Sequence, residues 1–495
     1  MSDTAAASTA TESDAASKHY GEGGALGKTG FAWAVFEWAR NPYYILIVIY
    51  IFAPYFAREV MGADILASGE LDGMDPETAR RTANAGGQAA IASVTKWAGL
   101  VGAFTAPFLG AALDRGGRRK PILAVFLGTI ALMSWLLWYA IPGESGFSTG
   151  TIMTFLVIAY VCYTYSEVTH NSMLAVAGAP QSLPMISGLG LGLGNLAATI
   201  LFIALVGLFA LPGIIGWPFA SPQFGISLEA FEHQRLAGPL CAVWLFLFSI
   251  PFFLYAEDGG TKGASWPKAF KDGANAVFTT LKEATKYLQM MKFLIARMLY
   301  ADAMAALLAL GAVYVALFLE WGFLEMTAYA IFGSIWAFGG GILGGWMDTK
   351  LGPKVSLIIS IVAMVATLGF QLSITQESLF FGLVDNFQVW DGLIFQTLSD
   401  LVYLGSISVV AVTATASISS SRSMLVHLAP PGRSGEFFGL YAIAGTVTVW
   451  AGPLLVEIFT NAFNSQRIGM ASISVLFLMG LAVLTTVKMN EQAQA

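Results

Sequence analysis

Long apolar stretches alternate with short polar breaks from about residue 31 to residue 488 of this chain. Twelve stretches are long enough to cross a bilayer, because a helix rises about 1.5 Å per residue and the hydrocarbon layer is roughly 30 Å thick. The pattern therefore predicts an all-α polytopic membrane protein with twelve transmembrane helices. The predicted spans are Phe31–Phe56, Gly87–Leu113, Pro121–Ile141, Thr149–Leu174, Ile186–Leu211, Leu236–Tyr255, Phe293–Leu319, Ala328–Trp346, Val355–Ile374, Asp400–Leu425, Phe437–Phe459 and Ile468–Val487.

One polar break occurs twice, which predicts a duplicated architecture. The first copy is Gly110-Ala-Ala-Leu-Asp114-Arg115-Gly-Gly117-Arg118-Arg119-Lys120, and the second, Gly344-Gly-Trp-Met-Asp348-Thr-Lys350-Leu-Gly352-Pro-Lys354, starts 234 residues later (344 − 110). A second echo pairs Asn171-Ser-Met-Leu174 with Arg422-Ser-Met-Leu425. We therefore expect two pseudo-symmetric six-helix bundles, a build that is typical of secondary transporters.

The expected domains follow from these repeats. Residues 31–256 form the first bundle and residues 292–488 the second, between a disordered tail (1–30) and a short tail (489–495). The linker, residues 257–291, carries scattered lysines and aromatic residues; it is either an interfacial amphipathic helix over about Ala269–Leu288 or a solvated connector. The first 30 residues contain no apolar core segment, so we do not expect them to be a cleavable signal peptide.

Composition and charge narrow the class further. Hydrophobic residues make up 56% of the chain and charged residues 11%, which excludes an ordinary soluble domain. No basic block points to nucleic acid, and both cysteines lie in apolar stretches, as free thiols do. If the N-terminus is cytoplasmic, 17 of the 25 Lys and Arg residues lie on that side and five on the other. The positive-inside rule thus places both termini in the cytoplasm. We also expect the protein to lie in the cell membrane and to be a monomer.

Several segments carry a resemblance to known transporters. The turn from Gly110 to Arg119 resembles the signature between helices 2 and 3 of the major facilitator superfamily. Within that superfamily, other segments resemble the autophagy-type vacuolar effluxer family, in its bacterial form. They are Phe36-Glu-Trp-Ala-Arg-Asn-Pro42, His170-Asn-Ser-Met-Leu, Ser187-Gly-Leu-Gly-Leu-Gly-Leu-Gly194, Ala296-Arg-Met-Leu-Tyr-Ala-Asp302, Ser421-Arg-Ser-Met-Leu, Gly435-Glu-Phe-Phe-Gly-Leu-Tyr441 and Gly452-Pro453.

The resemblance implies the major facilitator fold, an alternating-access carrier, and amino-acid efflux as in the characterised eukaryotic relatives. The family's first helix usually reads Tyr-Asp-Trp-Ala-Asn-Ser; here Glu37 replaces the Asp and Arg40 the Asn, and Pro42 follows. The resemblance also implies that Asp114 faces the start of helix 11 near Gly435–Phe437 and holds the inner side shut, within a signature of Gly110, Asp114, Arg115, Gly117, Arg118 and Arg119. The second copy, around Asp348, is expected to be weaker.

Charges inside the bilayer are the candidate substrate or gating residues, because each costs about 2.5–3.5 kcal/mol at the centre of a helix on insertion scales. We expect them in the cytoplasmic half, in a polar network that joins the two bundles: Arg297 with Glu37 or Glu167, and Asp302 with a basic group such as Arg40. Static pairs or snorkelling side chains are the alternative. The candidates are Glu37, Arg40, Glu167, His170, Arg297, Asp302 and Arg422.

Two further patterns remain open. His170 beside Glu167 (i, i+3) is a candidate for coupling transport to a proton, although a membrane histidine is more often structural. Lys96, Asp400 and Glu457 fall nearer the outer ends, where they form an outer vestibule or anchor the surface. The glycines between Gly188 and Gly194 favour close helix packing over a nucleotide loop, since no strand precedes them.

The sequence thus predicts a secondary active transporter of a small organic solute, with amino-acid or metabolite efflux implied by the resemblance. A proton- or sodium-coupled drug or sugar transporter stays open. A membrane-embedded enzyme or receptor is the alternative from another class. We expect no cofactor and no metal site, since four His and two Cys show no ligand spacing and no nucleophile elbow or phosphate loop is present.

Overall fold

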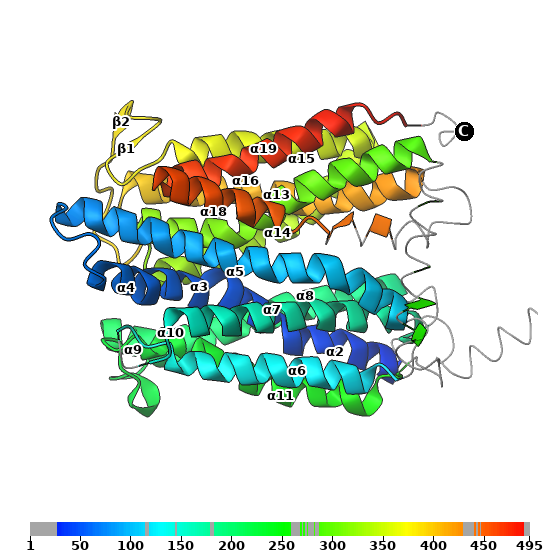
Figure 1. Cartoon of the computed structure of the whole chain (residues 1–495), viewed down its shortest axis with the longest axis horizontal. Helices are drawn as coiled ribbons and strands as arrows, with labels where there is room; N and C mark the ends of the chain where they lie inside the picture. Colours follow the sequence, from blue (N-terminus) through cyan, green and yellow to red (C-terminus); the bar gives the residue numbers. More distant parts are fainter. Residues whose placement is uncertain are drawn as a thin grey trace, which may run out of the picture.

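The fold is a layered array of long helices (Figure 1). The computed structural model describes residues 27–489 apart from 114–117, 144–145, 179–182, 259–267, 270, 273–274, 276–281, 283–286, 429–439, 442–443 and 446. Within that part, eleven helices are long and apolar enough to cross a membrane, by length and composition. The other predicted span, Phe437–Phe459, overlaps the shorter apolar helix α18 (Ala451–Phe463), whose preceding residues lie partly outside the description. The all-α fold expected from the hydropathy pattern is confirmed.

The first half of the chain supplies six membrane helices. The first is continuous over Lys28–Ala67 and contains π-helical turns. Its parts are α2 (Lys28–Pro42), η1 (Tyr43–Tyr50), α3 (Phe52–Tyr55), η2 (Phe56–Met61) and α4 (Gly62–Ala67). The others are α5 (Pro76–Leu113), α6 (Lys120–Leu136) with η3 (Leu137–Tyr139), α7 (Thr149–Ser172) with η4 (Leu174–Val176), α8 (Leu183–Leu205) with η5 (Val206–Ala210) and α9 (Leu211–Ile215), and α11 (Ala237–Tyr255), preceded by η6 (Gln223–Gly225) and α10 (Glu232–Arg235).

The second half repeats this order. Its helices are α13 (Leu288–Phe318), α14 (Phe323–Leu351), α15 (Pro353–Leu372), α16 (Leu398–Leu428), α18 and α19 (Gln466–Thr485). A two-stranded antiparallel hairpin, β1 (Ser378–Leu379) with β2 (Val384–Asp385), lies in the loop before α16. In Figure 1 the second-half helices lie in the upper layer and most first-half helices in the lower, with α5 between them.

The two halves pack in the same way. Helix α2 contacts α8 and α11, as α13 contacts α18 and α19. The pairs α5–α7, α6–α7 and α6–α11 correspond to α14–α16, α15–α16 and α15–α19. The bundles meet where α5 packs on α18 and α13, and where α8 approaches α14. Matching neighbours in both halves confirm two pseudo-symmetric six-helix bundles.

The repeated turn has one structural role in both bundles. Lys120 Nζ donates a hydrogen bond to the carbonyl oxygen of Phe253 (2.9 Å), near the end of α11. Lys354, its counterpart, donates to the carbonyls of Thr485 (2.9 Å) and Val487 (2.6 Å), at the end of α19. The last carbonyls of a helix lack intrahelical partners and attract cations. Each lysine therefore ties the start of its bundle's third helix to the end of the sixth.

Helix boundaries differ from prediction at one end of the molecule. The first helix extends to Ala67 rather than Phe56, and α5 begins at Pro76 rather than Gly87, so the connection is only Ser68–Asp75. The extensions carry polar residues that bond to the other bundle, and a hydropathy pattern reports only the apolar part of a helix. The amphipathic linker helix proposed for Ala269–Leu288 lies largely outside the described residues.

Small residues let the helices approach closely. A Cβ on Gly340 of α14 would lie 2.5 Å from the carbonyl oxygen of Val412 in α16. One on Gly190 of α8 would lie 3.3 Å from Cγ of Glu37 in α2. The packing interpretation of the glycine run is confirmed at Gly190 and Gly194, which both face α2.

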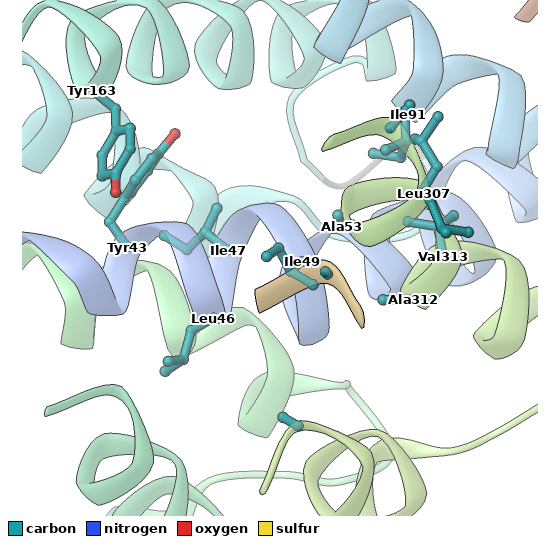
Figure 2. Packing of buried hydrophobic residues seen from close by; sticks show 14 of the residues in the cluster. Tyr43, Leu46, Ile47, Ile49, Ala53, Ile91, Tyr163, Leu307, Ala312 and Val313 are labelled. Atoms are coloured by element: carbon teal, nitrogen blue, oxygen red, sulfur yellow. The ribbon is translucent and has the colours of Figure 1, made fainter. Parts of the chain in front are cut away.

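An apolar seam continues from the first bundle into the second. Figure 2 shows Ile91 of α5 close to Leu307 and Val313 of α13, and Tyr43 next to Tyr163. These side chains belong to one buried hydrophobic cluster. The bundles therefore share a core as well as polar contacts.

Candidate functional site

Charged residues of α2 and α7 meet in the first bundle. Both carboxylate oxygens of Glu37 accept hydrogen bonds from Nη2 of Arg40, at 2.8 and 2.9 Å. The second guanidinium nitrogen, Nη1, lies 3.7 Å from Oε2 of Glu167. The Arg40 guanidinium also lies 4.4 Å from the centre of the Tyr163 ring, a cation–π contact. The predicted pairing of Glu37 with Arg40 along one helix face is therefore present.

His170 completes this cluster, but with a different partner than predicted. Its Nδ1 lies 3.3 Å from Oε1 of Glu37, and its Nε2 lies 3.0 Å from the carbonyl oxygen of Trp33. The imidazole stacks on the Trp33 indole, with ring centres 4.0 Å apart, and touches the Phe36 ring. Although Glu167 and His170 share a helix, Glu167 is 49% exposed and His170 0%, because one side chain turns outward and the other into α2.

Accessibility rises stepwise through the cluster. His170 is fully buried, Arg40 is 5% exposed and Glu37 is 15% exposed, whereas Glu167 is about half exposed. Pairing offsets the cost of removing the inner charges from water. Within the cluster, the Glu167 carboxylate is therefore the most exposed group.

The candidate residues of α13 bond within their own bundle. Arg297 Nη1 donates to the carbonyl oxygen of Tyr441 (2.6 Å), and the guanidinium lies 3.4 Å from the centre of that ring. The predicted pair of Arg297 with Glu37 or Glu167 is not formed, because the arginine is used inside the second bundle. Arg422 is exposed on α16. The expected network between bundles is thus replaced by two separate groups, and a gating role stays a prediction.

Asp302 also has another partner than predicted. It is 3% exposed, and its Oδ2 accepts a hydrogen bond from the backbone N–H of Gly452 (3.0 Å) in the first turn of α18. A carboxylate is favoured at a helix N-terminus, where N–H groups lack partners. Asp302 therefore caps α18 instead of pairing with Arg40. Because α13 begins at Leu288, Asp302 lies about 21 Å along the helix, near its middle rather than near its start, where it was expected.

The predicted signature turn is described in part. Asp114, Arg115 and Gly117 lie outside the described residues, as does the expected contact of Asp114 with Gly435–Phe437. A Cβ on Gly110 would lie 3.4 Å from Val168, so this glycine lets α5 approach α7. Arg118 is exposed, whereas Arg119 is buried.

Arg119 joins helix ends. Its guanidinium donates to the carbonyl oxygens of Ser172 (2.5 Å) and Leu113 (3.4 Å), at the ends of α7 and α5. Its backbone N–H donates to Asp258 (2.5 Å). In the second copy, Asp348 Oδ1 accepts a hydrogen bond from Ser420 Oγ (2.5 Å), which links α14 to α16. The basic turn therefore ties together the helix ends of the first bundle.

Sequence reasoning missed the polar contacts between the bundles. Arg58 Nη1 donates to the carbonyls of Ala316 (3.4 Å) and Trp321 (3.2 Å), and Asn84 Nδ2 donates to that of Leu317 (3.0 Å). First-bundle side chains thus satisfy carbonyls at the C-terminal end of α13, where cations are favoured.

Ion pairs continue this contact along α5. Lys96 and Glu457 form one at 2.6 Å, with side chains 15% and 20% exposed, and Arg80 pairs with Glu320. Lys96 and Glu457 are therefore partners across the bundle interface and not surface anchors. The only sequence signal was a charge within each apolar run, and nothing in the sequence pairs the two.

A cavity of about 400 Å³ lies at the same end, lined by the first helix and α5 of the first bundle and by Glu320. Arg58, Glu59, Arg80, Asn84 and Glu320 line it. These groups also bond to one another or to the end of α13. Within the described residues, no group of three or more His, Cys, Asp and Glu is placed to hold a metal ion.

Comparison with known proteins supports a transporter. A family model described as "Vacuole effluxer Atg22 like" matches residues 181–495. The chain is 21% identical to an uncharacterized MFS-type transporter, YxiO, of Bacillus subtilis (strain 168), over 92% of this chain and 94% of that protein. It is 24% identical to autophagy-related protein 22-2 of Neosartorya fischeri, over 62% of this chain and half of that protein.

Solved transporters share the fold. A bacterial homolog to the human lysosomal transporter Spinster, in an inward-facing and unoccupied conformation, aligns with a TM-score of 0.55 at 13% identity, covering 93% of this chain and 95% of that one. A peptide transporter, POT, in complex with alafosfalin, aligns with a TM-score of 0.57 at 16% identity, over 96% and 98%.

Proposed function

Because this chain belongs to the Atg22-like vacuole effluxer family and is a transporter of the major facilitator type, we propose that it exports a small zwitterionic metabolite, such as an amino acid, by alternating access. The observation that carries the proposal is the charged cluster on α2 and α7. It contains a guanidinium and a half-exposed carboxylate, Arg40 and Glu167, 3.7 Å apart. A zwitterion carries the two complementary charges.

The bundle contacts support alternating access. Arg58, Asn84 and Lys96 of the first bundle bond to α13 and α18 in the half of the molecule away from the start of α2 and the end of α19 (Figure 1). Breaking these contacts exposes the carbonyls of Ala316 and Leu317, so closure at this end has a specific stabilisation. We propose that this is the state closed on the far side, with both termini cytoplasmic and the carrier in the cell membrane as a monomer.

The test is transport by purified protein in vesicles. Each of the twenty amino acids, with glucose, uridine and ethidium as other solute classes, is assayed by counterflow. We expect amino-acid exchange, and at least a tenfold loss in Glu167→Gln, which keeps the size of the side chain and removes its charge. Glu70→Gln, in the exposed Ser68–Asp75 connection, is the matched control. If the protein exchanges glucose or ethidium but no amino acid, the proposed substrate class is wrong.

A membrane enzyme or receptor is the alternative from another class. The family assignment favours a carrier, and we propose that the chain has no catalytic activity. Reconstituted protein that exchanges none of these solutes but converts a bilayer lipid would contradict this proposal.

A further inference from the structure

The hydrogen-bond geometry around His170 requires a proton. Its Nε2 faces the carbonyl oxygen of Trp33 at 3.0 Å, and a carbonyl only accepts, so Nε2 carries a hydrogen. A neutral imidazole has one N–H, which leaves Nδ1 with a lone pair. That lone pair would point to the Glu37 carboxylate, whose Oε1 lies 3.3 Å away. Two acceptors at this distance repel, and His170 is fully buried while Glu37 is 15% exposed, so one further proton is expected between Nδ1 and Oε1.

Packing leaves His170 no other arrangement. The Trp33 indole donates its own N–H to the His170 carbonyl (3.0 Å), and the two rings are stacked at an interplanar angle of 16°. Phe36 and Phe252 contact the imidazole from α2 and α11. Rotating the ring would lose the Trp33 hydrogen bond, so the imidazole stays oriented with Nδ1 toward Glu37.

The charges around this proton are few. Among the described side chains, those that face it are Glu37 and Arg40 on α2 and Glu167 and Tyr163 on α7, while α11 presents the Phe252 ring and α8 presents Gly190. With a neutral imidazole, two carboxylates and one guanidinium leave the cluster one negative charge in excess. One added positive charge makes it neutral, and neutrality is strongly favoured inside a membrane.

We infer that the cluster binds one positive charge at a time: a proton between His170 and Glu37, or the ammonium group of the solute at Glu167. This inference rests on the proposed function for its second ligand. The proton enters from water at Glu167 and binds at Nδ1 of His170 or Oε1 of Glu37; it leaves as the same proton, and no covalent bond to the solute forms. Because the two ligands neutralise the same excess charge, each weakens the other's binding. The solute therefore leaves in exchange for a proton.

Protonation can be read without transport. The chain has four histidines, so ¹⁵N-histidine NMR of the whole protein in nanodiscs, compared with His170→Gln, identifies the His170 signals. We expect Nε2–H at every pH and a reversible shift of Nδ1 on titration between about pH 5 and about pH 8. His427→Gln, on an exposed position of α16, should leave the His170 signals unchanged. A His170 signal that does not change over this range would overturn the proton site.

Exchange is tested in vesicles that contain a pH-sensitive dye. An equimolar mixture of the twenty amino acids is loaded inside, and the probe is proton entry on their release. We expect the wild type to take up protons as amino acids leave, and the number of protons taken up per amino acid released to fall at least tenfold in His170→Gln. If the histidine variant folds poorly, Glu37→Gln, which keeps an oxygen for Arg40, is used instead; it should lower the same ratio of protons taken up to amino acids released.

The outcomes separate the two proposals. Amino-acid release from wild-type vesicles without proton entry would refute the exchange and leave the proposed export standing. A His170 that titrates in a protein that moves no amino acid would refute the export and leave the proton site standing.

Discussion

The Lys96–Glu457 pair should set the balance between the two states of the carrier. Removing one partner from a buried ion pair costs about 3–5 kcal/mol, because the remaining charge is left unpaired. With side chains 15% and 20% exposed, we reduce this to about 2 kcal/mol. Since about 1.4 kcal/mol is a factor of ten, Lys96→Met should shift the closed-to-open ratio at this end roughly 30-fold toward open.

The assay is a distance between spin labels on the two bundles. Met74→Cys and Leu383→Cys place labels on exposed loop positions, in a background that lacks Cys162 and Cys241. We expect a longer distance in Lys96→Met and a return to the original distribution when Glu457→Met is added, because no charge then stays unpaired. A single variant with the wild-type distribution, or a double variant as open as the single one, would refute the reasoning.

Two further predictions concern stability. Gly340→Leu should lower the free energy of unfolding by about 1–3 kcal/mol, because its Cβ would meet the Val412 carbonyl. Gly345→Ala, with open space around it, should have the melting temperature of the wild type. A normal melting temperature for Gly340→Leu would show that α14 and α16 do not touch. Asp302→Ala should cost about 1–2 kcal/mol through loss of the α18 cap, and Asp302→Asn, which still offers an acceptor to Gly452, should cost less. Equal thermal shifts for these two variants would exclude the capping role.

Local patterns in the sequence predicted the site only in part. The spacing of Glu37 and Arg40 placed them on one helix face, and the structure pairs them. The same rule placed Glu167 with His170, yet the histidine turns into α2. Spacing along a helix says which residues are near one another. It does not say which of them points into the protein, because that depends on the neighbouring helix.

By itself, the sequence determined the class of this protein: apolar length requires membrane helices, and a repeated turn requires two alike bundles. Lys120 and Lys354 could be matched by position before their common contact to a final helix was known. Only the tertiary structure decided that Asp302 caps α18 and that Lys96 meets Glu457. Those partners are 150 and 361 residues apart (452 − 302 and 457 − 96). The hydrophobicity of a segment depends only on its own residues, so the sequence predicts which segments enter the membrane. Which charges pair depends on how the helices pack, and the sequence does not show this.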